Sequence, residues 1–200
     1  LNNSDNRDKY FQIPIELIYV KAYHLSRAFA LLNEFSYIHA DFKTDNFFVS
    51  LDEDGKCALI DFDSGAIIET LEDDTYTWGT PQDMLAPEIF EQLSYNEVIK
   101  VNLFSDMWSV AMANHYLIFC IHPLFFLNQI TRNSVTEYIN KYDWPAIDTQ
   151  SHLFNKEMMD VYEWYLSAVS YLPKDILNCF KVTVTQGYET KELRTTYNQW

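Results

Sequence analysis

The sequence predicts a mainly α-helical domain that carries one short β-hairpin. Apolar residues recur at helical spacing from Pro14 to Phe35. The longest apolar segment, residues 110–127, is interrupted by polar residues, so we expect a buried core helix and its exit rather than a membrane span. The 200 residues are 48% hydrophobic and 16% aromatic, which suffices to bury one sizeable core. Residues 1–13 are expected to be a polar lead-in and residues 14–200 the folded unit.

The remaining elements follow from local patterns. Pro14 suits the first turn of the first helix. Two short apolar runs, residues 47–50 and 57–60, flank a turn at Asp54-Gly55 and predict the hairpin. Amphipathic patterns predict three later helices, over residues 135–142, 156–171 and 174–184. An apolar stripe on the second of these helices is expected to pack in the core (Val161, Trp164, Tyr165, Ala168, Tyr171).

Polar residues gather at one end of the predicted hairpin. Asp41, Lys43 and Asn46 lie in one loop before the first strand, and Asp61 ends the second strand. The hairpin should therefore bring Asp61 beside Asn46. Phosphoryl transfer needs an oriented acceptor hydroxyl, a positive charge facing the phosphate, and hard oxygen ligands for Mg²⁺. Asp41, Lys43 and the pair of Asn46 and Asp61 can supply these in turn, so the spacing predicts a site for phosphate and divalent metal.

Five short motifs follow one another along the chain. They are H-A-D-F-K-T-D-N at residues 39–46, D-F-D at 61–63, G-T-P at 79–81, A-P-E at 86–88 and S-D-M-W-S at 105–109. At these residues the chain resembles the eukaryotic-type Ser/Thr protein kinase family, and its departures leave room for a divergent bacterial-type member. The resemblance runs from about residue 14 to the end, but covers only the C-lobe of that family. It implies a helical bundle whose hairpin carries the catalytic and metal-binding loops.

The resemblance implies a role for each matching residue. Asp41 and Lys43 would be catalytic, Lys43, Asn46 and Asp61 would contact ATP, and the last two would hold Mg²⁺ or Mn²⁺. Thr80 would contact the catalytic acid and shape the substrate site. The reaction implied is transfer of the γ-phosphate of ATP to a Ser or Thr hydroxyl of a protein.

Four other residues are expected to be structural. His39 could shuttle a proton, but the resemblance favours a packing and hydrogen-bonding strut. Glu88 should pair with Arg194, which would anchor this segment to the far end of the lobe. Asp106 is expected to start the central helix, as an N-cap or first-turn acid, and to tie back to the catalytic loop.

Two positions depart from the family pattern. Ala40 replaces an Arg that gathers an activation-segment phosphate, and Asp63 replaces a Gly whose φ freedom lets the metal-binding triplet move. Asp63 could stiffen the triplet, add a carboxylate near the metal, or be a solvated acid. Residues 66–78 already hold four acids, so an added phosphate would meet repulsion. We expect the segment to be active, or inactive, without being phosphorylated.

Half of the kinase nucleotide cleft is missing from this sequence. With only four Gly, the chain has no Gly-rich phosphate loop, and no V-A-I-K-like strand precedes the first helix. Both features belong to the N-lobe, which is expected from the same gene or from a separate chain. Three functions stay open: an active protein kinase lobe, a pseudokinase scaffold that binds a partner protein and, less favoured, a small-molecule phosphotransferase. The lobe alone is expected to be nearly inactive.

Charge and cysteine content limit the partners. A net charge of −15 argues against nucleic acid or an anionic membrane and favours a basic protein substrate. Cys57, Cys120 and Cys179 lack disulfide or metal spacing, so they are expected to be reduced, mostly buried thiols of a cytoplasmic protein. We expect no signal peptide in the opening residues, because residues 1–9 are polar and charged. Three further histidines lack ligand spacing and are expected to be structural or exposed (His115, His122, His152).

Overall fold

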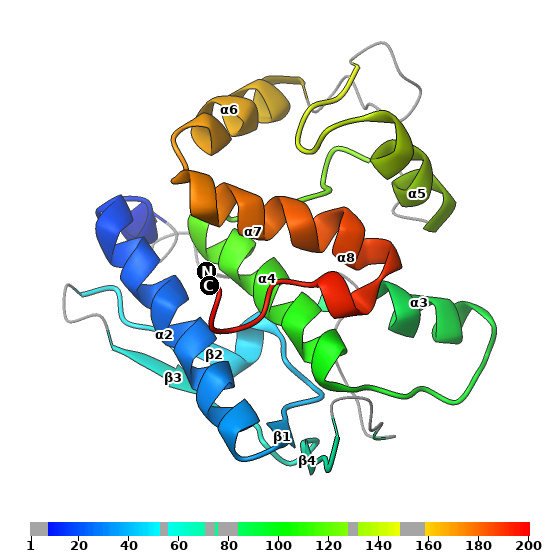
Figure 1. Cartoon of the computed structure of the whole chain (residues 1–200). Helices are drawn as coiled ribbons and strands as arrows, with labels where there is room; N and C mark the ends of the chain where they lie inside the picture. Colours follow the sequence, from blue (N-terminus) through cyan, green and yellow to red (C-terminus); the bar gives the residue numbers. More distant parts are fainter. Residues whose placement is uncertain (1–7, 53–55, 71–74, 76–83, 128–131, 149–158) are drawn as a thin grey trace.

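The structure, a computed structural model, describes residues 8–52, 56–70, 75, 84–127, 132–148 and 159–200. These residues form a mainly helical unit, as the sequence predicts. Helix α4 (Leu103–Phe119) runs through its centre and packs against α2 (Ile15–Glu34), which lies along one side, as Figure 1 shows. The other helices are α3 (Pro87–Ser94), α5 (Arg132–Lys141), α6 (Met159–Ser170), α7 (Lys174–Val184) and α8 (Gln186–Glu189), with short 3-10 turns η1 (Thr44–Asn46) and η4 (Lys191–Leu193).

Helix α4 is buried almost all round, because apolar side chains cover every face of it. Its N-cap is Asn102, whose side chain accepts from the backbone N–H groups of Phe104 and Ser105, while Ser105 Oγ accepts from the Asn102 N–H at 2.8 Å. This reciprocal pair is a capping box. Asp106 lies in the first turn, as expected, but the N-cap is Asn102.

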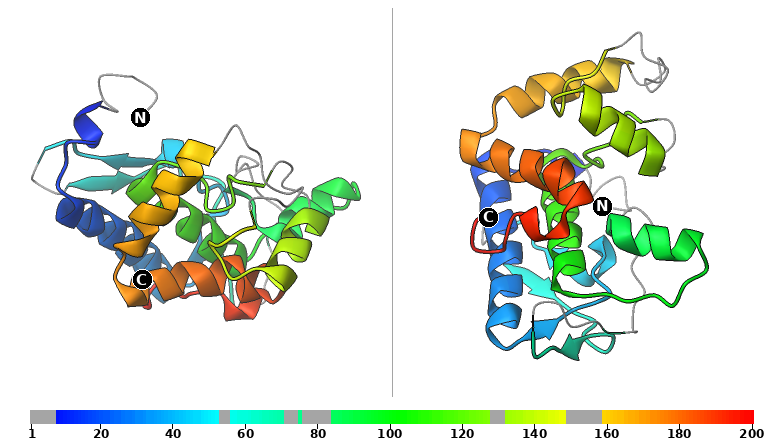
Figure 2. Two further views of the ribbon diagram at one scale, coloured as in Figure 1. Left: turned by 90° about the horizontal axis from the view of Figure 1, so that it is seen from above. Right: turned by 45° about the vertical axis from the view of Figure 1, so that its right-hand side comes forward.

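Two small antiparallel strand pairs lie beside α2 (Figure 2). The predicted hairpin is present: β2 (Phe47–Val49) pairs with β3 (Cys57–Leu59), with Phe48 opposite Ala58. The second pair joins β1 (Tyr37–Ile38) to β4 (Ala66–Ile67). Sequence reasoning missed it because two residues are too few to show an alternating pattern.

The predicted core face of α6 is wrong in part. Tyr165 is buried, together with Tyr162 and Val169, whereas Val161, Trp164 and Tyr171 are exposed. Both faces of this helix are apolar, so periodicity could not decide between them. The buried face is the one whose rings meet α4 and its exit: Tyr165 contacts His115 and Phe119, and Tyr162 contacts Phe126.

Other expectations fare differently. The free thiols of Cys57, Cys120 and Cys179 are half-buried rather than buried. Tyr10, in the expected lead-in, is buried, and its hydroxyl donates to the Leu117 carbonyl at 2.5 Å. Among the described residues, no helix is both long and apolar enough to cross a bilayer.

Candidate active site

The predicted catalytic loop leads from β1 into the hairpin and is fixed by one buried acid. Asp106, on α4, accepts the backbone N–H of His39 at 2.6 Å and of Ala40 at 3.1 Å through its two carboxylate oxygens. Ala40 has φ 64°, a left-handed conformation that L-residues adopt at a cost of about 1–3 kcal/mol. The hydrogen bonds to the Asp106 carboxylate therefore stabilise a left-handed conformation at Ala40 that is unfavourable without them.

Asp106 itself is fully buried. Burial raises its pKa to about 6, while the N–H groups of His39 and Ala40 act in the opposite direction by stabilising the carboxylate. A buried acid that receives two backbone donors has satisfied oxygens and a fixed position. The tie between Asp106 and the loop, expected from the sequence, is present.

Asp41 and Lys43 lie against each other at the centre of the loop. Lys43 Nζ donates to Asp41 Oδ2 at 2.9 Å. This hydrogen bond is the main reason that the pKa of Lys43 is raised, and the charges of Asp61 and Asp45 add to it. Asp61 therefore lies near enough to Lys43 for the two charges to interact.

Asn46 and Asp61 are brought together by the hairpin. The Asn46 carbonyl accepts the Ile60 N–H at 2.9 Å, so Asp61 follows directly after the residue paired with Asn46. The Asn46 side-chain nitrogen donates to the Asp41 carbonyl at 2.9 Å, which fixes the amide group against the loop. Asp61 is exposed and has φ 67°. Two oxygen donors therefore lie at adjacent backbone positions.

These donors suit Mg²⁺. Within the described residues there is no group of three or more His, Cys, Asp and Glu side chains that could hold a metal. Mg²⁺ is usually held by one or two protein oxygen ligands, with substrate phosphates and water completing its shell. Asn46 and Asp61 would hold the ion, which would offset the charge of the bound phosphates.

His39 lies between the two loops. Its Nε2 is 3.0 Å from the Ile60 carbonyl, and its ring packs against Phe29, Phe42 and Phe62. Nε2 is thus paired with the Ile60 carbonyl, and Nδ1 is buried with no hydrogen-bond partner in the described part of the chain. These contacts favour a structural role for His39, in which its ring joins the predicted catalytic loop to the hairpin, over a role as a proton shuttle.

Glu88 and Arg194 form the expected pair. Arg194 donates to both Glu88 carboxylate oxygens, and also to the backbone carbonyls of Gly187 and Phe104, each at 2.8 Å. Its guanidinium lies 5.3 Å from the Trp108 ring centroid, a cation–π contact. Burial raises the pKa of Glu88, but the Arg194 charge and hydrogen bonds outweigh it, so the net pKa is lowered.

Comparison with known families decides the assignment. Residues 6–173 match the family described as the protein kinase domain. The chain belongs to the protein kinase family. No curated protein matches it. In this member of the family Lys43 and Asn46 both contact Asp41, and Asp61 follows Ile60, which is hydrogen-bonded to Asn46. Thr80 lies outside the described residues.

Both departures from the kinase pattern now have a structural setting. Asp63 does not share the positive φ of Asp61, so the position needs no glycine in this conformation. Ala40 does have positive φ, but the Asp106 carboxylate fixes its N–H.

In the expected activation segment, Thr75 exchanges two backbone hydrogen bonds with Val101, which tie it to the residues that lead into α4.

Sequence reasoning missed one positioning residue of the kinase site. The Tyr37 hydroxyl donates to the carbonyl of Phe62, the residue that follows Asp61. Phe62 in turn accepts the Gly65 N–H at 3.1 Å, which closes the turn after the triplet. A Tyr before the catalytic loop carries no local signal for such a contact, because its partner is remote in sequence.

Proposed function

We propose that this lobe transfers the γ-phosphate of ATP to a Ser or Thr hydroxyl of a protein, together with an N-lobe from the same gene or a separate chain. The observation that carries the proposal is the state of Asp41. One carboxylate oxygen is engaged by Lys43, while Oδ1 has no hydrogen-bond partner among the described residues. That oxygen is buried as well as unpaired, and an unpaired buried carboxylate oxygen is costly, so a substrate hydroxyl that reaches it would donate a hydrogen bond to it and be oriented by it.

The neighbouring residues supply what remains. Lys43 would offset charge on the transferred phosphate, and Asn46 and Asp61 would hold Mg²⁺, whose charge would stabilise the phosphate. Catalysis of phosphoryl transfer is mostly positioning and charge stabilisation, so a loop held rigidly by Asp106 suits it. The net charge of −15 supports a basic protein substrate.

The outer face of the hairpin supports the need for a nucleotide and a second lobe. Phe48 is 57% exposed, and Ala58 and Ile60 on the same face are also exposed, whereas Val49 and Leu59 on the other face are half-buried. The solvent face of an antiparallel hairpin is normally polar. An apolar outer face beside Asn46 suits a nucleotide base and an N-lobe lying over it.

The test measures phosphate transfer by a protein that contains both this lobe and its N-lobe. With Mg²⁺-ATP and a Lys- and Arg-rich protein, we expect incorporation at Ser or Thr that Asp61→Asn abolishes. Asp52→Asn removes an exposed acid elsewhere in the hairpin and is the matched control, so it should leave transfer unchanged. Transfer by Asp61→Asn at the wild-type rate would contradict the proposal.

One alternative has observations of its own. Ala40 and Asp63 favour a pseudokinase scaffold that binds a partner protein. Such a scaffold would give no phosphate incorporation in the assay above while still binding its partner. Phosphorylation of an aminoglycoside or choline in preference to protein would instead indicate a small-molecule phosphotransferase.

A further inference from the structure

The outer face of α6 exposes large apolar side chains. Val161, Trp164 and Tyr171 are 39%, 49% and 82% exposed, and Ala168 lies between them, half-buried. The spacing of three, four and three residues places all four side chains on one side of the helix and its exit. They form what we call the α6 stripe.

The fold does not need the α6 stripe for its own core. The opposite face of the helix already supplies the packing: the Tyr165 hydroxyl lies 2.8 Å from His115 Nε2, and the Tyr162 hydroxyl donates to the Pro145 carbonyl at 3.0 Å. Exposed Trp and Tyr side chains are enriched at protein interfaces, where they act as anchors. The stripe therefore has the composition of a binding surface.

Acidic residues border the α6 stripe. Asp160 and Glu163 are both exposed and lie on the side of Trp164 that faces away from Val161. Asp175 follows Tyr171 in the first turn of α7 and is also exposed, next to Lys174. A partner that covers the stripe would meet apolar rings flanked by negative charge, which favours a partner carrying Lys and Arg beside its own apolar side chains.

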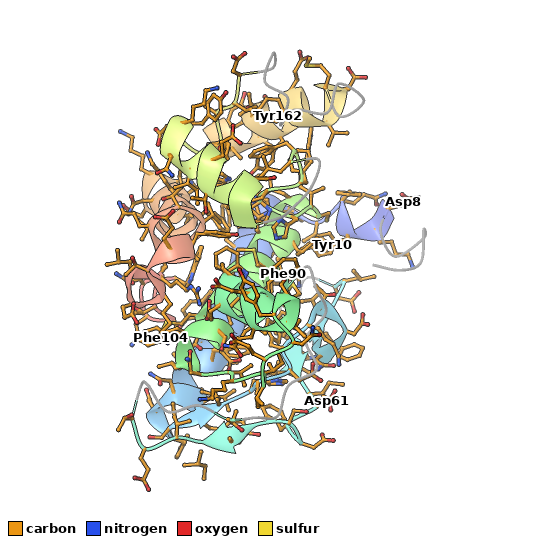
Figure 3. The ribbon with its side chains drawn as sticks, turned by 90° about the vertical axis from the view of Figure 1, so that its right-hand side faces the viewer. Asp8, Tyr10, Asp61, Phe90, Phe104 and Tyr162 are labelled. Atoms are coloured by element: carbon orange, nitrogen blue, oxygen red, sulfur yellow. The ribbon has the colours of Figure 1, made fainter. Side chains whose placement is uncertain are left out.

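We propose that the α6 stripe docks a basic amphipathic helix of a partner protein. Such a helix would lay its apolar face on Trp164 and Tyr171 and its basic edge along Asp160 and Glu163. The surface lies at the opposite end of the lobe from the metal-binding acid, as the labels of Tyr162 and Asp61 in Figure 3 show. Docking there leaves the site open, and it does not depend on whether the lobe transfers phosphate.

The test is fluorescence anisotropy with a labelled synthetic helix that carries Leu at positions i, i+3, i+4 and i+7 and Lys elsewhere. Two control peptides replace Lys by Glu, or Leu by Ser. We expect saturable binding of the basic amphipathic peptide alone. Trp164→Ala and Tyr171→Ala should each weaken it at least about tenfold. Joint Asp160→Lys and Glu163→Lys should also weaken binding and reduce its dependence on salt.

Tyr23→Ala on α2 is the matched control, since Tyr23 is an exposed aromatic outside the α6 stripe. It should leave the dissociation constant unchanged. Circular dichroism melts should show that all variants fold, and amide shifts of the wild-type chain on peptide addition should centre on α6. Binding of either control peptide as tightly, unchanged binding by Trp164→Ala, or no binding at about 1 mM peptide would overturn the proposal. A Trp164-dependent dimer seen in sedimentation would overturn it too, in favour of a second copy as the occupant.

Discussion

Arg194 and Glu88, 106 residues apart in the chain, face each other through two hydrogen bonds of 2.8 and 2.5 Å. Arg194 is fully buried and also donates to two backbone carbonyls, on either side of the contact between α4 and the C-terminal segment. One side chain thus joins α3, α4 and α8. Its removal would leave a carboxylate and two carbonyls without their donors.

Arg194→Met should lower the free energy of unfolding by about 3–5 kcal/mol, because it strands the Glu88 charge. The exposed pair of Lys181 and Asp143, with Nζ and Oδ1 2.5 Å apart, provides the control. Lys181→Met should cost less than about 1 kcal/mol. Urea unfolding of both variants checks the difference, and equal losses would show that Arg194 contributes no more than a surface ion pair.

Gly187→Ala should destabilise the same region by about 1–3 kcal/mol through overpacking. A Cβ atom at Gly187 would lie 2.7 Å from Arg194 Cγ and 3.2 Å from its Cα, so backbone would have to move. At Gly65 the nearest atoms to the added Cβ are the hydroxyl end of the Tyr37 side chain, so relief requires that ring to swing away and give up its exposed hydrogen bond with the Phe62 carbonyl, not a backbone shift. Gly65→Ala should therefore cost less, and thermal unfolding of the two variants should rank them in this order.

Asp106→Asn should loosen the catalytic loop without unfolding the lobe. An amide has one acceptor oxygen, so the N–H of either His39 or Ala40 would face an NH₂ group. With that restraint gone, Ala40 should leave its left-handed conformation. Hydrogen exchange checks this: the amides of residues 39 and 40 should exchange faster, while the α4 amides keep their protection. Unchanged protection at both positions would show that Asp106 does not fix the loop.

His115 should make the lobe acid-sensitive. Burial lowers its pKa to about 3, opposed by its contact with the Ile121 carbonyl and assisted by the charge of His122. Because its ordinary value is 6.5, the unfolded chain binds the proton first as pH falls. The contribution of His115 to the free energy of unfolding is fully present above pH 6.5. Below that pH it declines, by up to about 1.4 kcal/mol per pH unit.

The variant His115→Phe isolates this effect. Asp106 acts in the opposite sense, since its raised pKa makes its contribution fall as pH rises from 3.8 to about 6. The wild-type curve therefore contains two opposing slopes. We expect His115→Phe to be less stable at pH 7 by about 1–3 kcal/mol, because Tyr165 and the Ile121 carbonyl lose their partner, and to lose less stability on acidification. Parallel curves for the two proteins would contradict this assignment.

Local patterns predicted elements whose signals lie within a few neighbouring residues. The first helix was expected from Pro14 to Phe35 and spans Ile15–Glu34, and the helix expected over residues 174–184 spans Lys174–Val184. The hairpin formed where an acidic turn separates two apolar runs. The residues of the candidate site were found in the same way, because phosphoryl transfer needs a fixed set of charged and amide groups at short spacing.

The sequence by itself determined the helical periodicity, the hairpin and the order of polar groups from Asp41 to Asp61, since each of these depends on residues close together in the chain. The tertiary structure alone decided which face of α6 is buried, that Asp106 holds Ala40 in a left-handed conformation, and that Tyr37 supports Phe62. In each case the deciding partner is remote in sequence: ring contacts with α4 selected Tyr162 and Tyr165 over Trp164. Both faces of α6 carry apolar side chains, so the sequence does not distinguish them. The buried face is the one whose side chains fit closely against α4 and its exit.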